Sequence, residues 1–274
     1  MKIKLLLIIS AFLLILPAAG WAELHYSGSS TIAIVLQESG AVAAFKKKTG
    51  IKIDPIDIVG SGKGIDALIA GKANIAGVSR ALNANERNEK LSANTIGYDA
   101  IGIFVHKSNP LKGLTKQQLK DIFTGKISNW KELGGNNAPI VPIIGDAAQK
   151  RGSTDFFREI VLEGIPFGSF EKRKFPRDQA EELAKRKYGI SYISVGLLET
   201  LDSSTRNNIR PVTVNQVAAT ESNVRNGSYP LSRPLLLVTK GVAKGAARDF
   251  INFMQSNEGQ SLIDVHFTPL RKSK

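Results

Sequence analysis

Hydroxyl and glycine residues gather in a turn near the start of the chain. Gly28-Ser29-Ser30-Thr31 follows a short apolar segment and opens a stretch with helical periodicity. The first N–H groups of a helix have no partner inside it, so with serine and threonine hydroxyls they can form an oxyanion site. The same residue types are typical of a helix cap without a ligand. The turn therefore indicates an anion site or a simple cap.

A second turn of this kind is Gly60-Ser61-Gly62-Lys63-Gly64. A nucleotide-binding phosphate loop would need glycine at position 57 and serine or threonine at position 64. Asp57 and Gly64 stand there instead. We therefore interpret Ser61 and its glycines as an oxyanion turn, with a tight turn that needs positive φ as the alternative.

Two charged residues follow candidate buried strands. Arg80 comes just after the apolar segment 75–78, at the strand end where α/β proteins usually bind ligands. The donors of its guanidinium suit a tetrahedral oxyanion, although a surface salt bridge would also explain the residue. Asp99 precedes a strongly apolar stretch and could accept a proton from a protonated oxyanion. Alternatively, Asp99 is the ion-pair partner of Arg80.

Signals for covalent or metal chemistry are weak. His25, His106 and His266 are too dispersed for metal-ligand spacing, and no Gly-x-Ser-x-Gly nucleophile elbow with nearby partners occurs. The absence of cysteine excludes disulfides, thiol catalysis and cysteine metal sites. The sequence thus favours a binding protein without cofactor or metal over an enzyme such as a phosphatase.

Candidate strands and helices alternate along the whole chain. This order predicts an α/β fold with mainly parallel strands flanked by helices. We expect one helix over Ile32–Lys48, and another that begins after Thr115, whose spacing to Gln118 is that of a capping box. A strand is expected over Ile96–Val105.

The chain is predicted to form two lobes. It crosses between them near 104–110 and again near 228–238, where strands meet turn residues. The first lobe would then combine 23–106 with 229–274, and the second would span 107–228. Such a layout is typical of two-lobed proteins that close around a ligand in the cleft.

The N-terminal residues indicate export. A basic start at Lys2 and Lys4, an apolar run over 5–16 and small residues at Gly20 and Ala22 predict a signal peptide, 1–22, cleaved after Ala22. The run is shorter than the roughly 20 residues of a spanning helix. Without a cysteine no lipid can be attached at the cleavage site, so we expect a soluble periplasmic protein.

The charge balance favours small anionic partners. The formal net charge is +13, and removal of Lys2 and Lys4 with the signal peptide leaves 13 − 2 = +11. Basic residues are scattered with few aromatic residues between them, which is typical of a solvated surface. We therefore expect no nucleic-acid partner.

Longer segments carry a family resemblance. The segment 226–235, NGSYPLSRPL, closely resembles a signature near the end of periplasmic phosphate-binding proteins, the solute receptors of phosphate ABC transporters. Segments 119–135, 189–192, 249–253 and 257–260 are similar to further motifs of that family, and the resemblance runs from Tyr26 to Leu270. It implies a venus-flytrap fold in which the two lobes hold hydrogen phosphate.

The resemblance implies roles for the first-lobe residues. Ser30, Thr31 and the N–H of Ile32 match contacts of the first family loop, and Ser61 matches the serine of the second. Asp99 is the candidate acceptor for the hydrogen of HPO4²⁻, which sulfate lacks. Some members place this aspartate where Arg80 stands here. Arg80 is itself a candidate ligand residue because its guanidinium donors suit a tetrahedral oxyanion.

The second-lobe loop departs from the family pattern. Aligned without gaps, the family arginine falls on Ala147, the serine on Arg151 and the threonine on Ser153, while Gly152 is retained. Arg151, Gly152 and Ser153 are the ligand candidates of this lobe, with the positive charge moved to Arg151. The alternative is a receptor or sensor for another oxyanion or a phosphorylated ligand.

The resemblance also implies partners. A receptor of this family is a monomer that delivers its ligand to the permease of an ABC transporter in the inner membrane. The same cleft would serve a sensor that signals to a membrane kinase or chemoreceptor.

Overall fold

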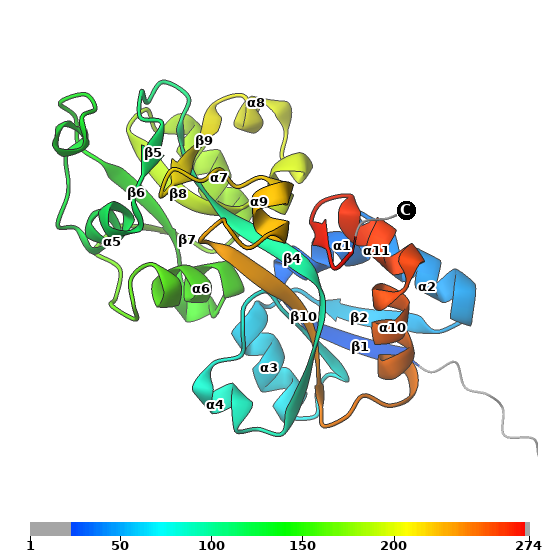
Figure 1. Ribbon diagram of the computed structural model, residues 1–274. Helices are drawn as coiled ribbons and strands as arrows, with labels where there is room; N and C mark the ends of the chain where they lie inside the picture. The colour runs from blue at the N-terminus through cyan, green and yellow to red at the C-terminus, as the bar shows by residue number, and fades with distance from the viewer. Residues whose placement is uncertain (1–22, 272–274) are drawn as a thin grey trace, which may run out of the picture.

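The computed structural model describes residues 23–271. The predicted signal peptide, 1–22, lies outside the described residues, as do the last three residues of the chain. Between these limits helices and strands alternate, as the hydrophobic pattern predicts (Figure 1).

The strands are short except for two. They are β1 (Glu23–Gly28), β2 (Lys52–Asp57), β3 (Ile75–Val78), β4 (Leu91–His106), β5 (Gly113–Leu114), β6 (Val141–Gly145), β7 (Glu171–Arg173), β8 (Gly189–Ser194), β9 (Ile209–Val214), β10 (Ser232–Lys240) and β11 (Thr268–Pro269).

The α-helices surround these strands. They are α1 (Ser30–Gln37), α2 (Ala41–Thr49), α3 (Ser61–Ile69), α4 (Ala84–Arg87), α5 (Lys116–Thr124), α6 (Gly152–Ile160), α7 (Pro176–Lys185), α8 (Ser203–Arg206), α9 (Glu221–Arg225), α10 (Gly245–Gln255) and α11 (Asn257–Asp264). Short 3-10 turns occupy Trp130–Leu133, Ala147–Gln149 and Val195–Thr200.

The sheet is continuous through both lobes, in the order β2-β1-β3-β10-β4-β8-β6-β7. The pairs β1–β2, β1–β3, β6–β7, β6–β8 and β5–β9 are parallel. Every antiparallel pair of named strands in the described residues involves β4 or β10. The α/β class with flanking helices is confirmed, with parallel strands outside and antiparallel crossing strands at the centre.

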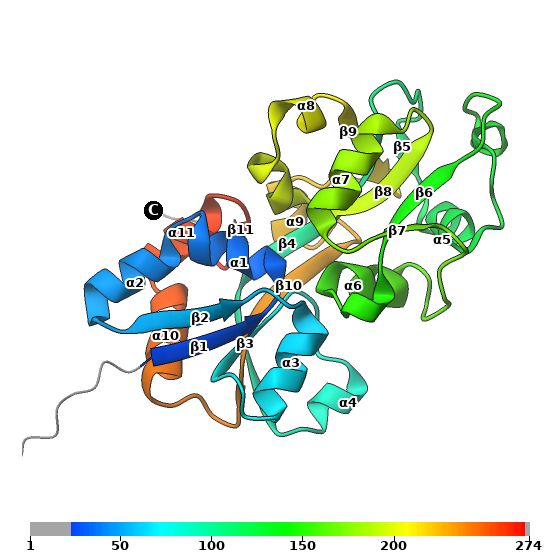
Figure 2. The same cartoon turned by 180° about the vertical axis from the view of Figure 1, so that it is seen from behind.

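β4 and β10 join the two lobes (Figures 1 and 2). β4 pairs with β10 through residues 91–100 and with β8 and β9 through residues 101–106. One long strand therefore belongs to the sheets of both lobes, and its register fixes how residues of the two halves meet. The lobe boundaries at 106/107 and 228/229 stay predictions.

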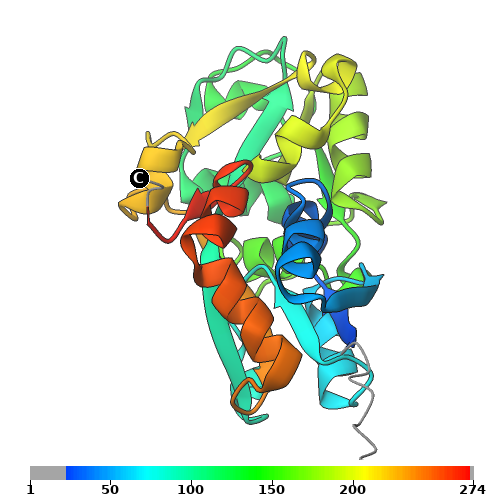
Figure 3. The same cartoon turned by 90° about the vertical axis from the view of Figure 1, so that its right-hand side faces the viewer.

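Each lobe has its own apolar core. In one, Phe45 of α2 meets Phe250 of α10 edge to face at 5.0 Å between ring centroids, so the two ends of the chain share a core. Figure 3 shows the blue N-terminal and the orange-red C-terminal helices in the same lobe. In the other, Phe157 of α6 stacks on Tyr192 of β8 at 4.2 Å. Because aromatic burial anchors α6 to the sheet, the N-terminus of this helix has a fixed position toward the cleft.

The predicted helix over Ile32–Lys48 is wrong as a single element. Gly40 adopts φ 77° in the left-handed region, which ends α1 and begins α2. The predicted capping box is confirmed: Thr115 Oγ1 accepts from the N–H of Gln118 at 3.1 Å, and Gln118 Oε1 accepts from the N–H of Thr115 at 2.8 Å. Among residues 23–271, no helix has the length and apolar character needed to cross a membrane.

Candidate functional site

The first turn caps a helix and also presents hydroxyls. Ser29 is the N-cap of α1, and its Oγ accepts from the N–H of Thr31 at 3.1 Å. The same Oγ donates to Ser79 Oγ at 2.9 Å. Ser30, Thr31 and Ile32 form the first turn of α1, at the carboxyl end of β1. The capping role and the gathering of hydroxyls therefore occur together.

The second turn lies beside the first. Gly60 has φ 103°, as the tight-turn interpretation requires, and Ser61 begins α3. Ser61 Oγ accepts from the N–H of Ser79 at 3.2 Å and lies 3.5 Å from Ser79 Oγ. Ser29, Ser61 and Ser79 thus bring three buried hydroxyls together from the ends of β1, β2 and β3.

Asp99 has a different partner from the one considered from sequence. In the antiparallel pairing of β4 with β10, Asp99 stands directly opposite Arg233. Asp99 Oδ2 accepts from Arg233 Nη2 at 2.7 Å, from Arg233 Nε at 3.0 Å and from Ser194 Oγ at 2.8 Å. The alternative that Asp99 pairs with Arg80 is wrong, because β10 supplies a closer arginine.

Arg233 also ties the hydroxyl loops together. Its Nη1 donates to the carbonyl of Ser79 at 2.8 Å and to Ser79 Oγ at 3.2 Å, and its Nη2 donates to Thr31 Oγ1 at 3.1 Å. Burial lowers the pKa of Arg233, and the contact with Asp99 opposes this shift. Sequence reasoning named Arg233 only within the signature segment. A cation directly before the apolar run 234–238 was the available signal.

Arg80 forms a buried ion pair and not the surface salt bridge considered from sequence. Its Nη1 and Nη2 donate to the two carboxylate oxygens of Glu86, each at 2.7 Å, and Asp155 of α6 lies 3.5 Å from its Nε. Burial alone would lower the pKa of Arg80, but Glu86 and Asp155 together outweigh it and the pKa is raised. Arg80 therefore links the first lobe to α6, and its role as a ligand residue stays a prediction.

The second-lobe loop lies directly against the first-lobe hydroxyls. Arg151 is the N-cap of α6, and Gly152 and Ser153 are its first residues. A Cβ added to Gly152 would stand 2.4 Å from Ser61 Oγ and 2.5 Å from Ser79 Oγ. Only glycine allows this approach. Three of the predicted residues, Ser61, Arg151 and Gly152, are thus brought to one place from opposite lobes. α3 and α6, which these residues begin, lie side by side (Figure 2).

Arg151 is buried without full compensation. Its Nε donates to the carbonyl of Lys174 at 3.0 Å, and its guanidinium lies 4.6 Å from the ring centroid of Phe175. Only 6% of the residue is exposed, and within the described residues Nη1 has no hydrogen-bond partner. Burial lowers the pKa of Arg151, and the charge of Asp178 opposes this shift. A buried donor of this kind is suited to an anion.

Further contacts cross between the loops of the two lobes. The N–H of Gly62 donates to the carbonyl of Lys150 at 3.0 Å. Lys150 Nζ lies 2.7 Å from Asp66 Oδ2, and Lys63 Nζ donates to Gln149 Oε1 at 3.1 Å. The structure therefore holds the lobes closed over the hydroxyl cluster.

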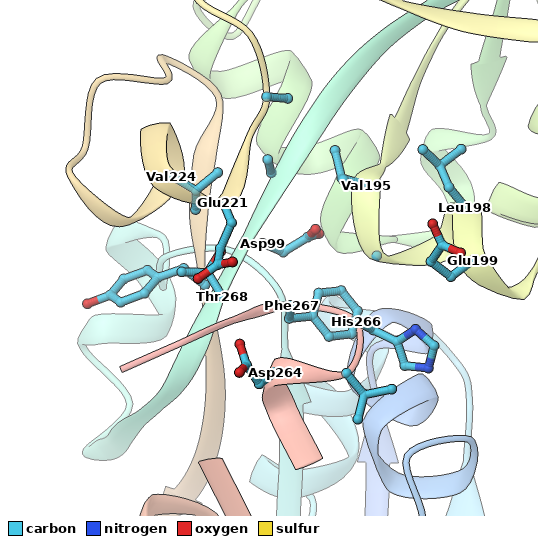
Figure 4. A pocket seen from close by; sticks show the side chains of 15 residues that line it. Asp99, Val195, Leu198, Glu199, Glu221, Val224, Asp264, His266, Phe267 and Thr268 are labelled. Carbon is cyan, nitrogen blue, oxygen red and sulfur yellow. The ribbon is translucent and has the colours of Figure 1, made fainter. Parts of the chain in front are cut away.

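A separate pocket of about 250 Å³ opens on another side of β4 (Figure 4). Asp99 lines it, together with the acidic residues Glu199, Glu221 and Asp264 and the ring of Phe267. No other predicted ligand residue contributes to its wall. Like charges repel, so this pocket is unsuited to an anion.

The histidines do not form a metal site. His25 Nε2 lies 2.8 Å from Asp57 Oδ2, and His106 Nδ1 lies 2.8 Å from Ser108 Oγ. Over residues 23–271, no three histidine, aspartate or glutamate side chains are grouped to hold a metal ion.

The amino-acid sequence of this chain is similar to sequences of known proteins. Residues 17–258 match the PBP superfamily domain. The phosphate-binding protein PstS of Staphylococcus epidermidis is 29% identical over 252 residues, which cover 88% of this chain and 76% of that protein. The PstS of Bacillus subtilis is 26% identical, and the matched region covers 100% of this chain and 95% of that protein.

Solved structures show the same similarity. A phosphate ABC transporter substrate-binding protein of Clostridium perfringens, solved with bound phosphate, is 35% identical with a TM-score of 0.80. The comparison covers 91% of this chain and 100% of that protein. An ABC-type phosphate transport receptor of Vibrio cholerae is 25% identical with a TM-score of 0.75, over 89% and 98% of the two chains. The chain therefore belongs to the PBP superfamily, and its resemblance to the phosphate-binding proteins of ABC transporters is confirmed.

Proposed function

We propose that the protein is a periplasmic receptor that binds hydrogen phosphate between its lobes and delivers it to an ABC transporter. The observation that carries this proposal is the meeting of Ser61 and Ser79 with the N-terminus of α6, beside Arg151, whose Nη1 has no hydrogen-bond partner in residues 23–271. Hydroxyls, helix N-termini and an arginine are the groups that bind a tetrahedral oxyanion away from water. The names of the similar proteins support phosphate as the ligand.

The residues divide into donors and positioning residues. Thr31, Ser61 and Ser79 supply hydroxyls, and the first turns of α1 and α6 supply N–H groups, including those of Ile32 and Ser153. Arg151 supplies positive charge. Arg233, already paired with Asp99, holds Thr31 and Ser79 in place and is a positioning residue.

Asp99 has one oxygen left for proton recognition. Its Oδ2 already accepts three hydrogen bonds, so the hydrogen of HPO4²⁻ would have to reach Oδ1. If Oδ1 receives this hydrogen, sulfate would bind poorly, because it has no such hydrogen and would place one of its oxygens against Oδ1. If it does not, Asp99 acts only through Arg233 and sulfate would be discriminated less strongly.

Lobe closure would convert binding into a signal for the transporter. The ion pair between Arg80 and Asp155 and the bond from Gly62 to Lys150 hold the closed arrangement. A permease that recognises the closed lobes would then take the ligand from a monomeric receptor. No covalent chemistry is required.

The test is a calorimetric titration of the mature chain. The protein is unfolded and refolded to remove ligand, then titrated with phosphate and, separately, with sulfate. Tight binding of phosphate with no heat from sulfate is the expected result. The absence of both heat and thermal stabilisation with phosphate would overturn the assignment of the oxyanion.

A further inference from the structure

A pocket of about 330 Å³ lies between the lobes and adjoins the hydroxyl cluster. Ser30 and Thr31, at the start of α1, form one end of it. Phe175, Pro176 and Asp178, at the start of α7 in the other lobe, face them. The pocket therefore shares residues with the proposed phosphate site, and no part of the proposed function uses the rest of its volume.

The walls of this pocket are largely apolar. Ala33 and Ile34 of α1 and Leu197 contribute on the inner side, and Ile58 and Phe175 stand toward solvent. Ile58 is 37% and Phe175 41% exposed, although both are large apolar side chains. They come from opposite lobes and line one opening. An exposed apolar lining in a concave place between lobes is typical of a ligand site.

Polar groups lie at both ends of the pocket, and Arg151 adjoins it through Phe175 without lining it. Arg151 stacks on Phe175 and has its Nη1 without a partner among the described residues. α7 begins at Pro176 with no side chain capping its N-terminus, and α1 begins at the opposite end of the same pocket. Positive potential from two helix N-termini and the adjoining guanidinium of Arg151 thus lies next to apolar walls. Glu38 and Asp178 also line the pocket, so the anionic head fits the oxyanion site beside it and only the apolar part fits the pocket itself. The combination fits a ligand with an anionic head and an apolar substituent.

We propose that this pocket is a subsite for the organic substituent of a phosphonate or phosphate monoester, whose tetrahedral head occupies the oxyanion site. The inference rests on the proposed function, since it places the head on the same hydroxyls and on Arg151. Inorganic phosphate has no apolar surface and gains nothing from Ile34, Ile58 or Phe175. A substituent that displaces water from these side chains gains affinity in proportion to the apolar area that it covers.

The experiment compares ligands with the same head. Methylphosphonate, phenylphosphonate, phenyl phosphate and inorganic phosphate are titrated into the refolded mature chain. We expect phenylphosphonate to bind at least about tenfold more tightly than methylphosphonate, because its larger apolar group covers more of the pocket wall. If phenyl phosphate likewise binds more tightly than inorganic phosphate, the subsite also accepts a monoester. If phenylphosphonate binds more tightly than methylphosphonate but phenyl phosphate does not bind more tightly than inorganic phosphate, the subsite accepts phosphonates only.

Variants locate the effect. Ile58→Ser and Phe175→Ser should each remove most of the preference for the phenyl group. Ile58 precedes the turn at Gly60, and its side chain has no hydrogen-bonding group to offer phosphate, so this variant should leave the binding of inorganic phosphate within about twofold. Val242→Ser is the matched control, because Val242 is an exposed apolar residue outside the pocket. It should change neither affinity nor preference.

The outcomes separate this inference from the proposed function. If phosphate binds and phenylphosphonate is no tighter than methylphosphonate, the subsite is overturned and the phosphate receptor stands. If phenylphosphonate binds and inorganic phosphate does not, the subsite stands and phosphate is not the ligand. If none of the four ligands binds, both proposals fail. A preference that survives both Ile58→Ser and Phe175→Ser also overturns the pocket as its cause.

Discussion

Two buried arginines, Arg233 and Arg151, stand on either side of the hydroxyl cluster and differ in their surroundings. Arg233 gives Nε and Nη2 to Asp99, Nη1 to Ser79 and a further contact to Thr31. Arg151 gives Nε to a backbone carbonyl, stacks on Phe175 and has Nη1 unpartnered among the described residues. One arginine is neutralised inside the fold, and the other is not.

This difference separates structural from binding charge. A cation paired with a carboxylate keeps its place without a ligand, but it offers an incoming anion little net charge. A buried cation without such a pair costs free energy until an anion arrives. We infer that Arg233 fixes the shape of the first-lobe loops and Arg151 provides the attraction for the ligand.

Loss of the carboxylate beside Arg233 should have the largest effect. Asp99→Ala leaves Arg233 buried without a counter-charge, and we expect the free energy of unfolding to fall by about 3–5 kcal/mol. Urea unfolding of the ligand-free protein measures it. Glu258→Ala is the control, since Glu258 pairs with Lys48 where both are about half exposed, and such pairs contribute about 0–1 kcal/mol. Equal losses in the two variants would contradict the comparison.

Removal of the second guanidinium should affect binding more than stability. Arg151→Met keeps the length and apolar stem beside Phe175 but deletes the charge. Hydrogen bonds to charged groups contribute about 1.5–3 kcal/mol, so phosphate affinity should fall about 10- to 100-fold. The free energy of unfolding should change by less than about 1 kcal/mol, because an uncompensated buried charge is removed.

Lys174→Met is the matched control for Arg151→Met. Lys174 is exposed, and its Nζ lies 5.3 Å from the centroid of the same Phe175 ring. Its replacement removes a neighbouring charge without touching the buried donor, so calorimetry should show phosphate affinity within about twofold of the original. If Lys174→Met weakened binding as much as Arg151→Met, general charge and not the buried guanidinium would attract the ligand.

Local pattern was sufficient for the parts of the site that are contiguous in sequence. The turns at Ser29 and Ser61 follow strands and open helices, as glycine and hydroxyl spacing predicted. The prediction of one helix from Ile32 was wrong at Gly40, because this left-handed residue interrupts the helix although the apolar periodicity continues on both sides. The capping box of Asn83 and Glu86 could have been found from its spacing, and it would have placed the Glu86 carboxylate at the start of a helix six residues after Arg80.

Long-range pairing was beyond the reach of sequence patterns. Asp99 and Arg233 are 134 positions apart, and they meet only because β10 lies antiparallel to β4 in one register. A shift of one residue would turn Arg233 to the other face of the sheet, away from Thr31 and Ser79. The apolar segments predict both strands but not their register, so the structure was needed to distinguish Arg233 from Arg80 as the partner of Asp99.

The exposed contact between the lobes should have the smallest effect. Lys150 and Asp66 are 2.7 Å apart, but both side chains are more than half exposed, so solvent weakens their attraction. We expect Lys150→Ala to reduce phosphate affinity by at most about fivefold, with the reduction shrinking as salt is added. Asp66→Ala should reduce phosphate affinity by the same factor, and the variant with both substitutions should bind phosphate no more weakly than either single variant. A loss above about tenfold that persists at high salt would mean that this contact holds the lobes closed, and the role given to Arg151 would then have to be shared with Lys150.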